Sequence, residues 1–229
     1  MFGIDETLRP KLVELKAELR LYMNGAAAAC MREKGLNYRV NFGVELPRLK
    51  EIAARHEKDH ALAQALWREE VRESKILAAL LQPVDTFTPD LAELWVDTLP
   101  TTEIAELTSM LLFQHLTYAP SLSFRWIADE RPLARICGFR VIARLLSRRG
   151  DMESRVANEL VDQAIATFVP GSLSERSAVM AALRTFIAHS DDHAYLVCDR
   201  VHPMKQSTIE GERLLFQAVE AELEEPPFR

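Results

Sequence analysis

Two carboxylates, Glu103 and Glu106, stand three residues apart at the start of an apolar run in the stretch LPTTEIAELTSMLLF. A carboxylate can stabilise a developing positive charge or orient a water molecule for hydrolysis. Acidic residues in the first turn of a helix also interact favourably with the helix dipole, by about 0.3–1 kcal/mol each. On a helix, Glu106 would share one face with Thr102 and Met110. The residue types alone leave both roles open.

Arg135 is a second candidate, because it projects into the middle of the apolar face of the run PLARICGFRVIARLL, with Gly138 beside it. A charge is very costly to bury alone, so it needs either an opposite charge or an exposed groove. One interpretation is a structural ion pair, and the other is a groove-facing arginine that binds phosphate. The sequence supports the two equally.

The stretch His56-Glu57-Lys58-Asp59-His60 matches the H-E-x-x-H pattern, whose two imidazoles bind zinc when they share one face of a helix. Here Asp59 resembles the N-cap of a new helix, which would break that geometry. Lys58 and Asp59 also place charge where a buried zinc helix would be apolar, and no third ligand follows at a suitable distance. We interpret the stretch as a solvated turn and expect no metal and no other cofactor.

The scaffold that must position these residues is predicted to be all-α. Caps and first-turn prolines recur with short connectors, and the apolar periodicity indicates about a dozen helices. The clearest start signals are Pro47, Asp59, Thr88-Pro89 and Pro132. The helices pair roughly every 35–40 residues, which favours a curved α-solenoid of about six HEAT-like helix pairs. We expect one domain over residues 1–229, in which YRVNFGV (38–44) is the only strand-like run.

The composition is ordinary for a globular protein. The 229 residues are 48% hydrophobic and 27% charged, which is enough for a sizeable core. No apolar run approaches the roughly 18 residues of a membrane span, and no secretory signal is visible. The cysteines Cys30, Cys137 and Cys198 are far apart and odd in number, which indicates buried thiols in a reducing compartment. We therefore expect a cytoplasmic protein with no membrane partner.

The charge is unevenly distributed along the chain. The net charge is -6, which argues against strong non-specific binding of nucleic acid by the whole surface. Residues 121–150, however, hold seven arginines against two acids, so a nucleic-acid partner stays open. Three of them, Arg140, Arg144 and Arg148, recur every four residues opposite the apolar side of their helix. A solvated outer stripe is the favoured interpretation of this row.

The segment 41–83 resembles the DNA alkylation repair family, the AlkD-like HEAT-repeat DNA glycosylases. The resembling pieces are FGV, PRLKEIA, LAQALW and RESKILAALL, in that order. The downstream helices fit the same register up to about residue 200. The resemblance implies a curved helical solenoid whose concave face holds duplex DNA. It also implies excision of cationic N3- or N7-alkylated purines without a base-flipping pocket.

The resemblance also assigns site residues on the helix that follows LAELWVDTL. The family carries a Trp-Asp-x-x-Asp stretch in its active cleft, and the register places Thr102, Glu103 and Glu106 on it. Thr102 then replaces an aromatic residue, and Glu106 replaces the catalytic aspartate with a side chain one methylene longer. The resemblance implies that Glu106 stabilises the sugar cation, with Thr102 and Glu103 in the cleft.

Further assignments fall in the second half of the chain. The family's cleft arginine falls on Arg135, which the resemblance implies as a phosphate clamp and part of the catalytic cleft. A second cleft tryptophan falls on Ala181 in VMAALRTF, whose Arg184 is then a contact to DNA. Two aromatic rings of the family are thus replaced, and such rings hold a cationic lesion by cation–π contact worth about 0.5–2 kcal/mol.

Three hypotheses follow. The first is a DNA-binding repair protein that acts as a weak alkylpurine glycosylase on duplex DNA. The second is a non-catalytic member of the same architecture that binds distorted or branched DNA. The third is a HEAT-like scaffold that binds proteins, which the acidic charge balance favours. We expect a monomer in each case.

Overall fold

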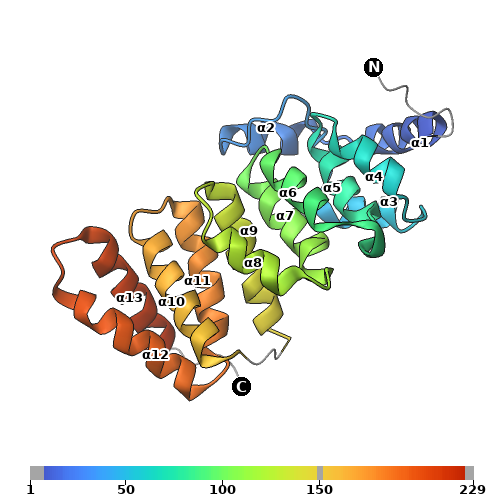
Figure 1. The fold of residues 1–229 in the computed structure, drawn as a ribbon. Coiled ribbons are helices and arrows are strands. Elements are labelled where there is room, and N and C mark those ends of the chain that lie inside the picture. The colour runs from blue at the N-terminus through green and yellow to red at the C-terminus, as the bar shows by residue number, and fades with distance from the viewer. Residues whose placement is uncertain (1–7, 149–151, 225–229) are drawn as a thin grey trace. The chain divides into compact units, whose positions relative to one another are not determined.

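The computed structural model describes residues 8–148 and 152–224, and the observations below concern these residues. They form thirteen α-helices and three short 3-10 helices, with no strand (Figure 1). The predicted all-α class is therefore confirmed. No helix in this described part is both long and apolar enough to cross a membrane. The chain divides into two compact units, Met1–Leu116 and Thr117–Arg229, which we describe separately, so that a single domain over 1–229 stays a prediction.

The first unit contains seven α-helices and two 3-10 turns. These are α1 (Leu8–Leu21), α2 (Gly25–Glu33), α3 (Leu46–Ala53), α4 (His60–Trp67), α5 (Arg72–Leu81), η1 (Val84–Thr86), α6 (Pro89–Asp97), α7 (Thr102–Leu111) and η2 (Phe113–His115). Helix α5 is the central element, since it packs against α3, α4 and α7. Beside it, the rings of Trp67 and Trp95 stack at 3.9 Å, and Phe87 meets Trp95 edge-on at 4.9 Å. Trp95, which is fully buried, thus contacts two aromatic rings in the core of this unit.

The second unit contains six α-helices and one 3-10 turn. These are α8 (Ala119–Ile127), α9 (Pro132–Leu146), α10 (Ser154–Phe168), α11 (Leu173–Ile187), α12 (Asp191–Val201), η3 (His202–Gln206) and α13 (Glu210–Glu224). Helix α9 packs between α8 and α11. Gly138 allows the close approach to α8, because a Cβ there would lie 2.7 Å from the Ile127 side chain and 2.8 Å from the Ser123 carbonyl oxygen.

The predicted helix starts are confirmed, two by capping hydrogen bonds and the others by first-turn prolines. Asp59 accepts a hydrogen bond from Leu62 N at 3.1 Å, and Thr88 accepts one from Leu91 N at 3.3 Å. Prolines occupy the first turns of α3, α6 and α9. Since Asp59 begins a new helix, His56 lies in the turn after α3 while His60 is the first residue of α4. The H-E-x-x-H stretch therefore spans a turn, as its interpretation required.

The strand-like run 38–44 is extended but forms no strand. Its ladder contact is an isolated bridge between Val40 and Val71, in which Val40 N donates to Glu70 O at 3.3 Å and Arg72 N donates to Val40 O at 3.1 Å. Of its apolar residues, Val44 is buried, Phe42 is half-buried and Val40 is 39% exposed, so backbone hydrogen bonds help to hold this segment between α2 and α3.

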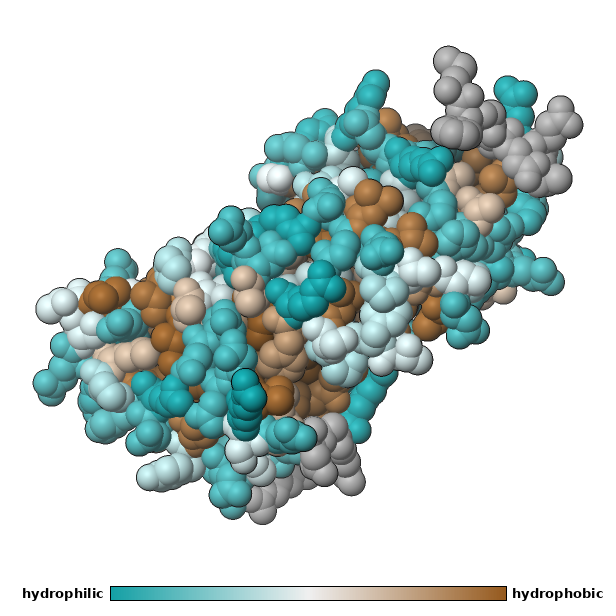
Figure 2. Space-filling view, viewed as in Figure 1, coloured by the Kyte–Doolittle hydropathy of each residue, from teal (hydrophilic) through white to brown (hydrophobic). Residues whose placement is uncertain are grey.

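The exposure of the cysteines differs from the prediction. Cys137 is buried, but Cys30 and Cys198 are exposed, so the prediction of buried thiols is wrong for two of the three cysteines. Both exposed thiols lie on short amphipathic helices, where a cysteine can face solvent as easily as the core. On the face shown in Figure 2, hydrophilic residues cover most of the surface and hydrophobic residues form separate patches.

Candidate functional site

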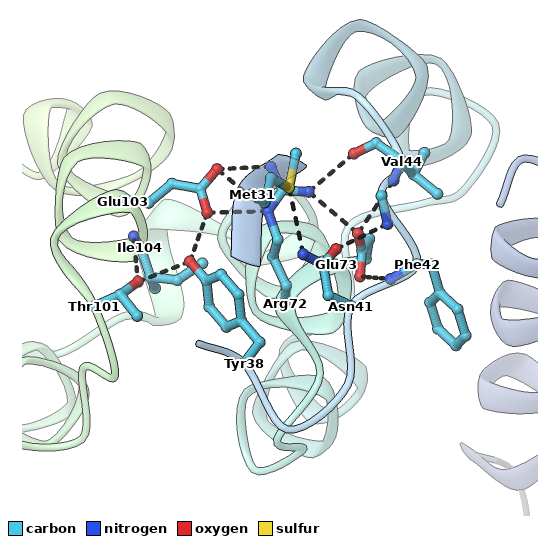
Figure 3. Close-up of polar contacts among 11 residues, drawn as sticks. Met31, Tyr38, Asn41, Phe42, Val44, Arg72, Glu73, Thr101, Glu103 and Ile104 are labelled. Atoms are coloured by element: carbon cyan, nitrogen blue, oxygen red, sulfur yellow. Dashed lines mark hydrogen bonds and ion pairs between the residues drawn. The ribbon is translucent and has the colours of Figure 1, made fainter. Parts of the chain in front are cut away.

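The N-terminus of α7 contributes Glu103 to a polar cluster inside the first unit (Figure 3). Arg72 donates from Nη2 to Glu103 Oε1 at 2.7 Å and from Nε to both carboxylate oxygens, at 3.0 and 3.2 Å. Tyr38 donates its hydroxyl hydrogen to Glu103 Oε2 at 2.5 Å, and its oxygen lies 2.7 Å from Thr101 Oγ1. One carboxylate thus joins α5, α7 and the connecting segment 38–44.

The electrostatics of this cluster keep Glu103 ionised. Burial disfavours the charged carboxylate, but the hydrogen bonds from Arg72 and Tyr38 and the charge of Arg72 outweigh burial and lower the pKa of Glu103. Burial and the adjacent carboxylate raise the pKa of Tyr38, so its hydroxyl stays a donor. A general base works best with a pKa near the operating pH. The geometry therefore favours a structural ion pair for Glu103.

On the other side of Arg72, Glu73 is fully buried and holds the segment 41–44 by its backbone (Figure 3). Its Oε2 accepts from Phe42 N at 3.1 Å, and its Oε1 accepts from Val44 N at 3.2 Å and from Arg72 Nη1 at 3.1 Å. Arg72 Nη1 also donates to Val44 O at 2.9 Å. The buried charges are thus paired and hydrogen-bonded. We call the segment 41–44 with Arg72 and Glu73 the NFGV clamp.

Gly43 is essential to the shape of the NFGV clamp. Its φ is +71°, and a Cβ there would lie 2.1 Å from Asn24 O. Asn41 Oδ1 accepts from Gly43 N at 2.8 Å, and Asn24 N donates to Phe42 O at 2.9 Å. The pieces FGV and RESKILAALL, on which the resemblance rests, therefore meet in one structural arrangement.

The other predicted residues of α7 lie beside this cluster. Thr101 caps the helix by accepting from Ile104 N at 3.3 Å, which places Thr102 and Glu103 in the first turn. Thr102 and Glu106 are both half-buried. All three cleft positions of α7 are thus partly accessible, and Glu103 is also held by its ion pair.

In the second unit, Arg135 of α9 is held by Glu175 of α11. Its Nε and Nη2 donate to Glu175 Oε1 at 3.0 and 2.5 Å, and its Nη1 donates to the carbonyl oxygens of Asp129 and Glu130 at 2.8 Å each. Glu175 Oε2 also accepts from the Ser172 backbone and hydroxyl, closing the capping box of α11. Of the two interpretations of Arg135, the ion pair is present in the structure.

Burial disfavours the charged form of Glu175, but the donors of Ser172 and Arg135 outweigh it and lower the pKa of this carboxyl. The Arg135 side chain is still 22% exposed. It faces a pocket of about 290 Å³ between the α8–α9 and α10–α11 turns, whose lining includes Ala128, Gln163 and Gly171. The arginine is therefore paired and partly accessible at once.

Ala181 and Arg184 lie close together on α11. Ala181 is half-buried and offers no ring to a ligand. Arg184 is 65% exposed and forms a two-pronged pair with Glu222 of α13, in which its Nε donates to Oε2 at 2.7 Å and its Nη2 donates to Oε1. Both residues are thus on the accessible side of their helix, although the guanidinium already has an anionic partner.

The arginine row of α9 lies on the less buried side of that helix. Arg140 and Arg144 are half-buried and Arg148 is exposed, whereas the opposite side supplies the core. Arg140 Nη2 donates to Ser177 Oγ of α11 at 3.0 Å. Arg149, the last arginine of the basic segment, lies outside the described residues.

Sequence reasoning missed four residues that organise these clusters: Tyr38, Arg72, Glu73 and Glu175. For Glu175 a signal existed, since Ser172 precedes it by three residues as in a capping box. Arg72 and Glu73 carry a weaker one, as adjacent charges at the start of a very apolar helix. Tyr38 carries none, because its partners lie more than sixty residues away in sequence. Among the described residues, no group of three or more His, Cys, Asp or Glu side chains could hold a metal ion.

Comparison with known proteins places this architecture in a family. A family model described as DNA alkylation repair enzyme matches residues 15–184. No curated protein matches the chain. A solved structure from a family related to the HEAT-like repeat DNA glycosylases, with affinity for branched DNA structures, matches with a TM-score of 0.73. The match covers 92% of this chain and 93% of that chain at 17% sequence identity, which establishes the predicted HEAT-like fold. Because the family model spans most of its length, the chain belongs to the DNA alkylation repair enzyme family.

Proposed function

We propose that this protein binds DNA through the phosphate backbone, prefers branched or distorted structures, and contributes to repair by binding more than by base excision. Membership in the DNA alkylation repair enzyme family supports DNA as the partner. The affinity of the structurally similar family for branched DNA supports the preference. The acidic net charge requires that binding depend on local basic surfaces, since the whole surface repels phosphate.

The observation that carries the proposal is the row of arginines on α9. Glu103 and Arg135, which the resemblance assigns to the cleft, are each held in a partly buried ion pair. The arginine row lies on the less buried side of its helix at a spacing of one turn, with Arg140 and Arg144 half-buried and Arg148 exposed. Such a row suits contacts to successive phosphates, which give affinity without requiring chemistry on a base.

The residues at the two aromatic positions support binding without excision. Thr102 and Ala181 stand where the resemblance expects rings that hold a cationic purine, and neither side chain can make a cation–π contact. A transition state with oxocarbenium character needs a carboxylate and a held lesion together. Without the rings, the lesion is not held, so the second requirement is not met.

Fluorescence anisotropy with a four-way junction and a duplex of equal length tests the proposal. We expect tighter binding to the junction, with an affinity that falls steeply as salt rises, because phosphate contacts release counterions. The Arg144→Gln variant should weaken binding and reduce the salt dependence by about one phosphate contact. Arg155→Gln on α10, which removes the same charge from an exposed position of the same unit, is the control.

Two results would contradict the proposal. Binding that is absent or insensitive to salt would favour the protein-binding scaffold instead. Equal losses in Arg144→Gln and Arg155→Gln would remove the arginine row from the interface, because the change would then follow net charge alone.

Weak excision of N3- or N7-alkylated purines is the second candidate function, and Glu106 is the observation in its favour. This carboxylate is half-buried on α7, and the Arg72 ion pair engages its neighbour Glu103. Release of N7-methylguanine from duplex DNA, compared between the wild type and Glu106→Gln, tests it directly. Equal release by both proteins would exclude excision that depends on this residue.

A further inference from the structure

The geometry points to a second contact with DNA in the first unit: we propose that the pocket between α2 and the segment 36–42 holds one unpaired nucleotide of a DNA branch. This inference rests on the proposed function, because it names the part of a branched structure that this unit would read. It concerns residues outside the cleft positions that the resemblance assigns.

The pocket has the size and lining of a small-ligand site. Its volume is about 390 Å³, within the range of pockets that hold small molecules. Its lining includes Met23, Arg32, Leu36, Tyr38, Arg39 and Phe42. Apolar and aromatic side chains thus share the pocket with two guanidinium groups, which is the combination that a base and its phosphate require.

Two residues of the pocket lining, Tyr38 and Phe42, are held by hydrogen bonds to carboxylates of α7 and α5 (Figure 3). The Tyr38 hydroxyl is held by Glu103, and the Phe42 backbone is held by Glu73 and Asn24. Val40, between them, is fixed by its bridge to the start of α5. An irregular segment held in this way is pre-formed, which lowers the entropic cost of binding a ligand.

Apolar surface remains accessible at this pocket. Met23 is 56% exposed and Val40 is 39% exposed, although both line the pocket. Methionine is flexible and polarisable, so it can pack against bases of different shape. In a duplex both faces of a base are covered by its neighbours, whereas an unpaired base offers a face for such contact. The pocket therefore favours an unpaired nucleotide over duplex DNA.

The charges around the pocket are suited to a phosphate. Arg32 is exposed and, within the described part of the chain, its side chain has no hydrogen-bond or ion-pair partner. Arg39 pairs with Glu70, but the two side chains are 78% and 64% exposed, and such surface pairs are weak. A phosphate could replace Glu70 as the partner of Arg39 and pair with Arg32 as well.

The test compares two three-way junctions by fluorescence anisotropy, one fully paired and one with a single strand of five unpaired thymidines at the branch. The wild type should bind the second more tightly. Arg32→Gln should reduce that preference by about tenfold, as expected for one charge-assisted hydrogen bond, and leave binding of the fully paired junction unchanged. Arg39→Gln should act in the same direction. Arg9→Gln, an exposed arginine of α1, is the matched control.

The outcomes separate this inference from the proposed function. If the wild type binds both junctions equally, or if all three variants weaken both junctions alike, the pocket does not hold the nucleotide, although DNA binding stands. If the wild type binds no junction, the proposed function fails. NMR titration with free pentathymidylate then decides about the pocket: shifts confined to Met23, Ala28 and Tyr38 would support a nucleotide site, and unchanged spectra would overturn it.

Discussion

The NFGV clamp of the first unit and the arginine pairs of the second unit use similar charges to different ends. In the clamp, Arg72 is 3% exposed and Glu73 is fully buried, and their donors and acceptors are filled by backbone and side chains. In the second unit, Arg135 and Arg184 are paired too, but their side chains are 22% and 65% exposed. The first arrangement fixes an irregular segment, and the second leaves cations close to solvent.

The contribution of an ion pair to stability therefore depends on its burial and on the other groups that it holds. Removing one partner of a buried pair leaves an uncompensated charge, which destabilises a protein by several kcal/mol. An exposed pair contributes little, so its arginine can exchange a carboxylate for a phosphate at small cost. We therefore expect mutations in the clamp to affect folding, and mutations of the exposed arginines to affect binding.

The largest effect is expected from Glu73→Ala, which would break the clamp. The substitution leaves the backbone N–H groups of Phe42 and Val44 without their buried acceptor and removes one of the two carboxylates that pair with Arg72. The free energy of unfolding should fall by about 3–5 kcal/mol, measured by urea denaturation at neutral pH. Glu73→Gln, which keeps an acceptor but no charge, should lose less. A loss below about 1 kcal/mol in the alanine variant would show that the clamp is not a stabilising unit.

Gly43→Ala tests the same clamp through its backbone. Ala at this position must adopt φ +71° and place its Cβ 2.1 Å from Asn24 O, a backbone atom that cannot move aside easily. We expect a loss of about 1–3 kcal/mol in the free energy of unfolding from the conformational strain, with a further loss from the clash. Gly35→Ala is the control, because its φ is +85° and its Cβ would meet nothing within 4 Å. If both variants lost the same free energy of unfolding, the close approach of Gly43 to Asn24 would not explain the loss.

Arg135→Gln tests an ion pair of intermediate burial, the pair between Arg135 and Glu175. It removes charge-assisted hydrogen bonds worth about 1.5–3 kcal/mol at neutral pH. The pKa of Glu175 is lowered from its ordinary value of 4.5, so the stabilisation by its partners is present above that pH and is lost as the pH falls through the folded-state pKa. The difference between the variant and the wild type should therefore shrink in urea denaturation series taken below pH 4.5. If the difference in free energy of unfolding stayed constant with pH, the loss would come from packing and not from the ion pair.

The smallest effect on stability is expected from Arg184→Gln. The Arg184 side chain of the pair with Glu222 is exposed, so salt screens the pair and its loss should change the free energy of unfolding by less than about 1 kcal/mol. The same variant should weaken DNA binding measurably if Arg184 exchanges Glu222 for phosphate. A loss of stability as large as that of Arg135→Gln would place this arginine with the structural pairs instead.

Much of the fold was predictable because the signals for helix starts lie in neighbouring residues. Asp59 and Thr88 cap the helices that their sequence context predicts, and first-turn prolines mark two more starts, those of α3 and α9. The apolar period and the spacing of the pairs then indicate a HEAT-like architecture. The run 38–44 was harder to interpret. Its alternating apolar residues predict a strand, but a strand forms only where a partner strand is available. Here the partners are the side chains and backbone at the start of α5.

By itself, the sequence determined the all-α class, the helix starts and the family, since capping, periodicity and motif order are properties of neighbouring residues. It also singled out Arg135 as a charge that needs a partner. Only the tertiary structure decided that this partner is Glu175, and that Glu103 belongs to Arg72 and Tyr38. The physical reason is that an ion pair depends on distance and burial in space, and these residues meet across intervals of 31 to 65 positions that no local pattern encodes.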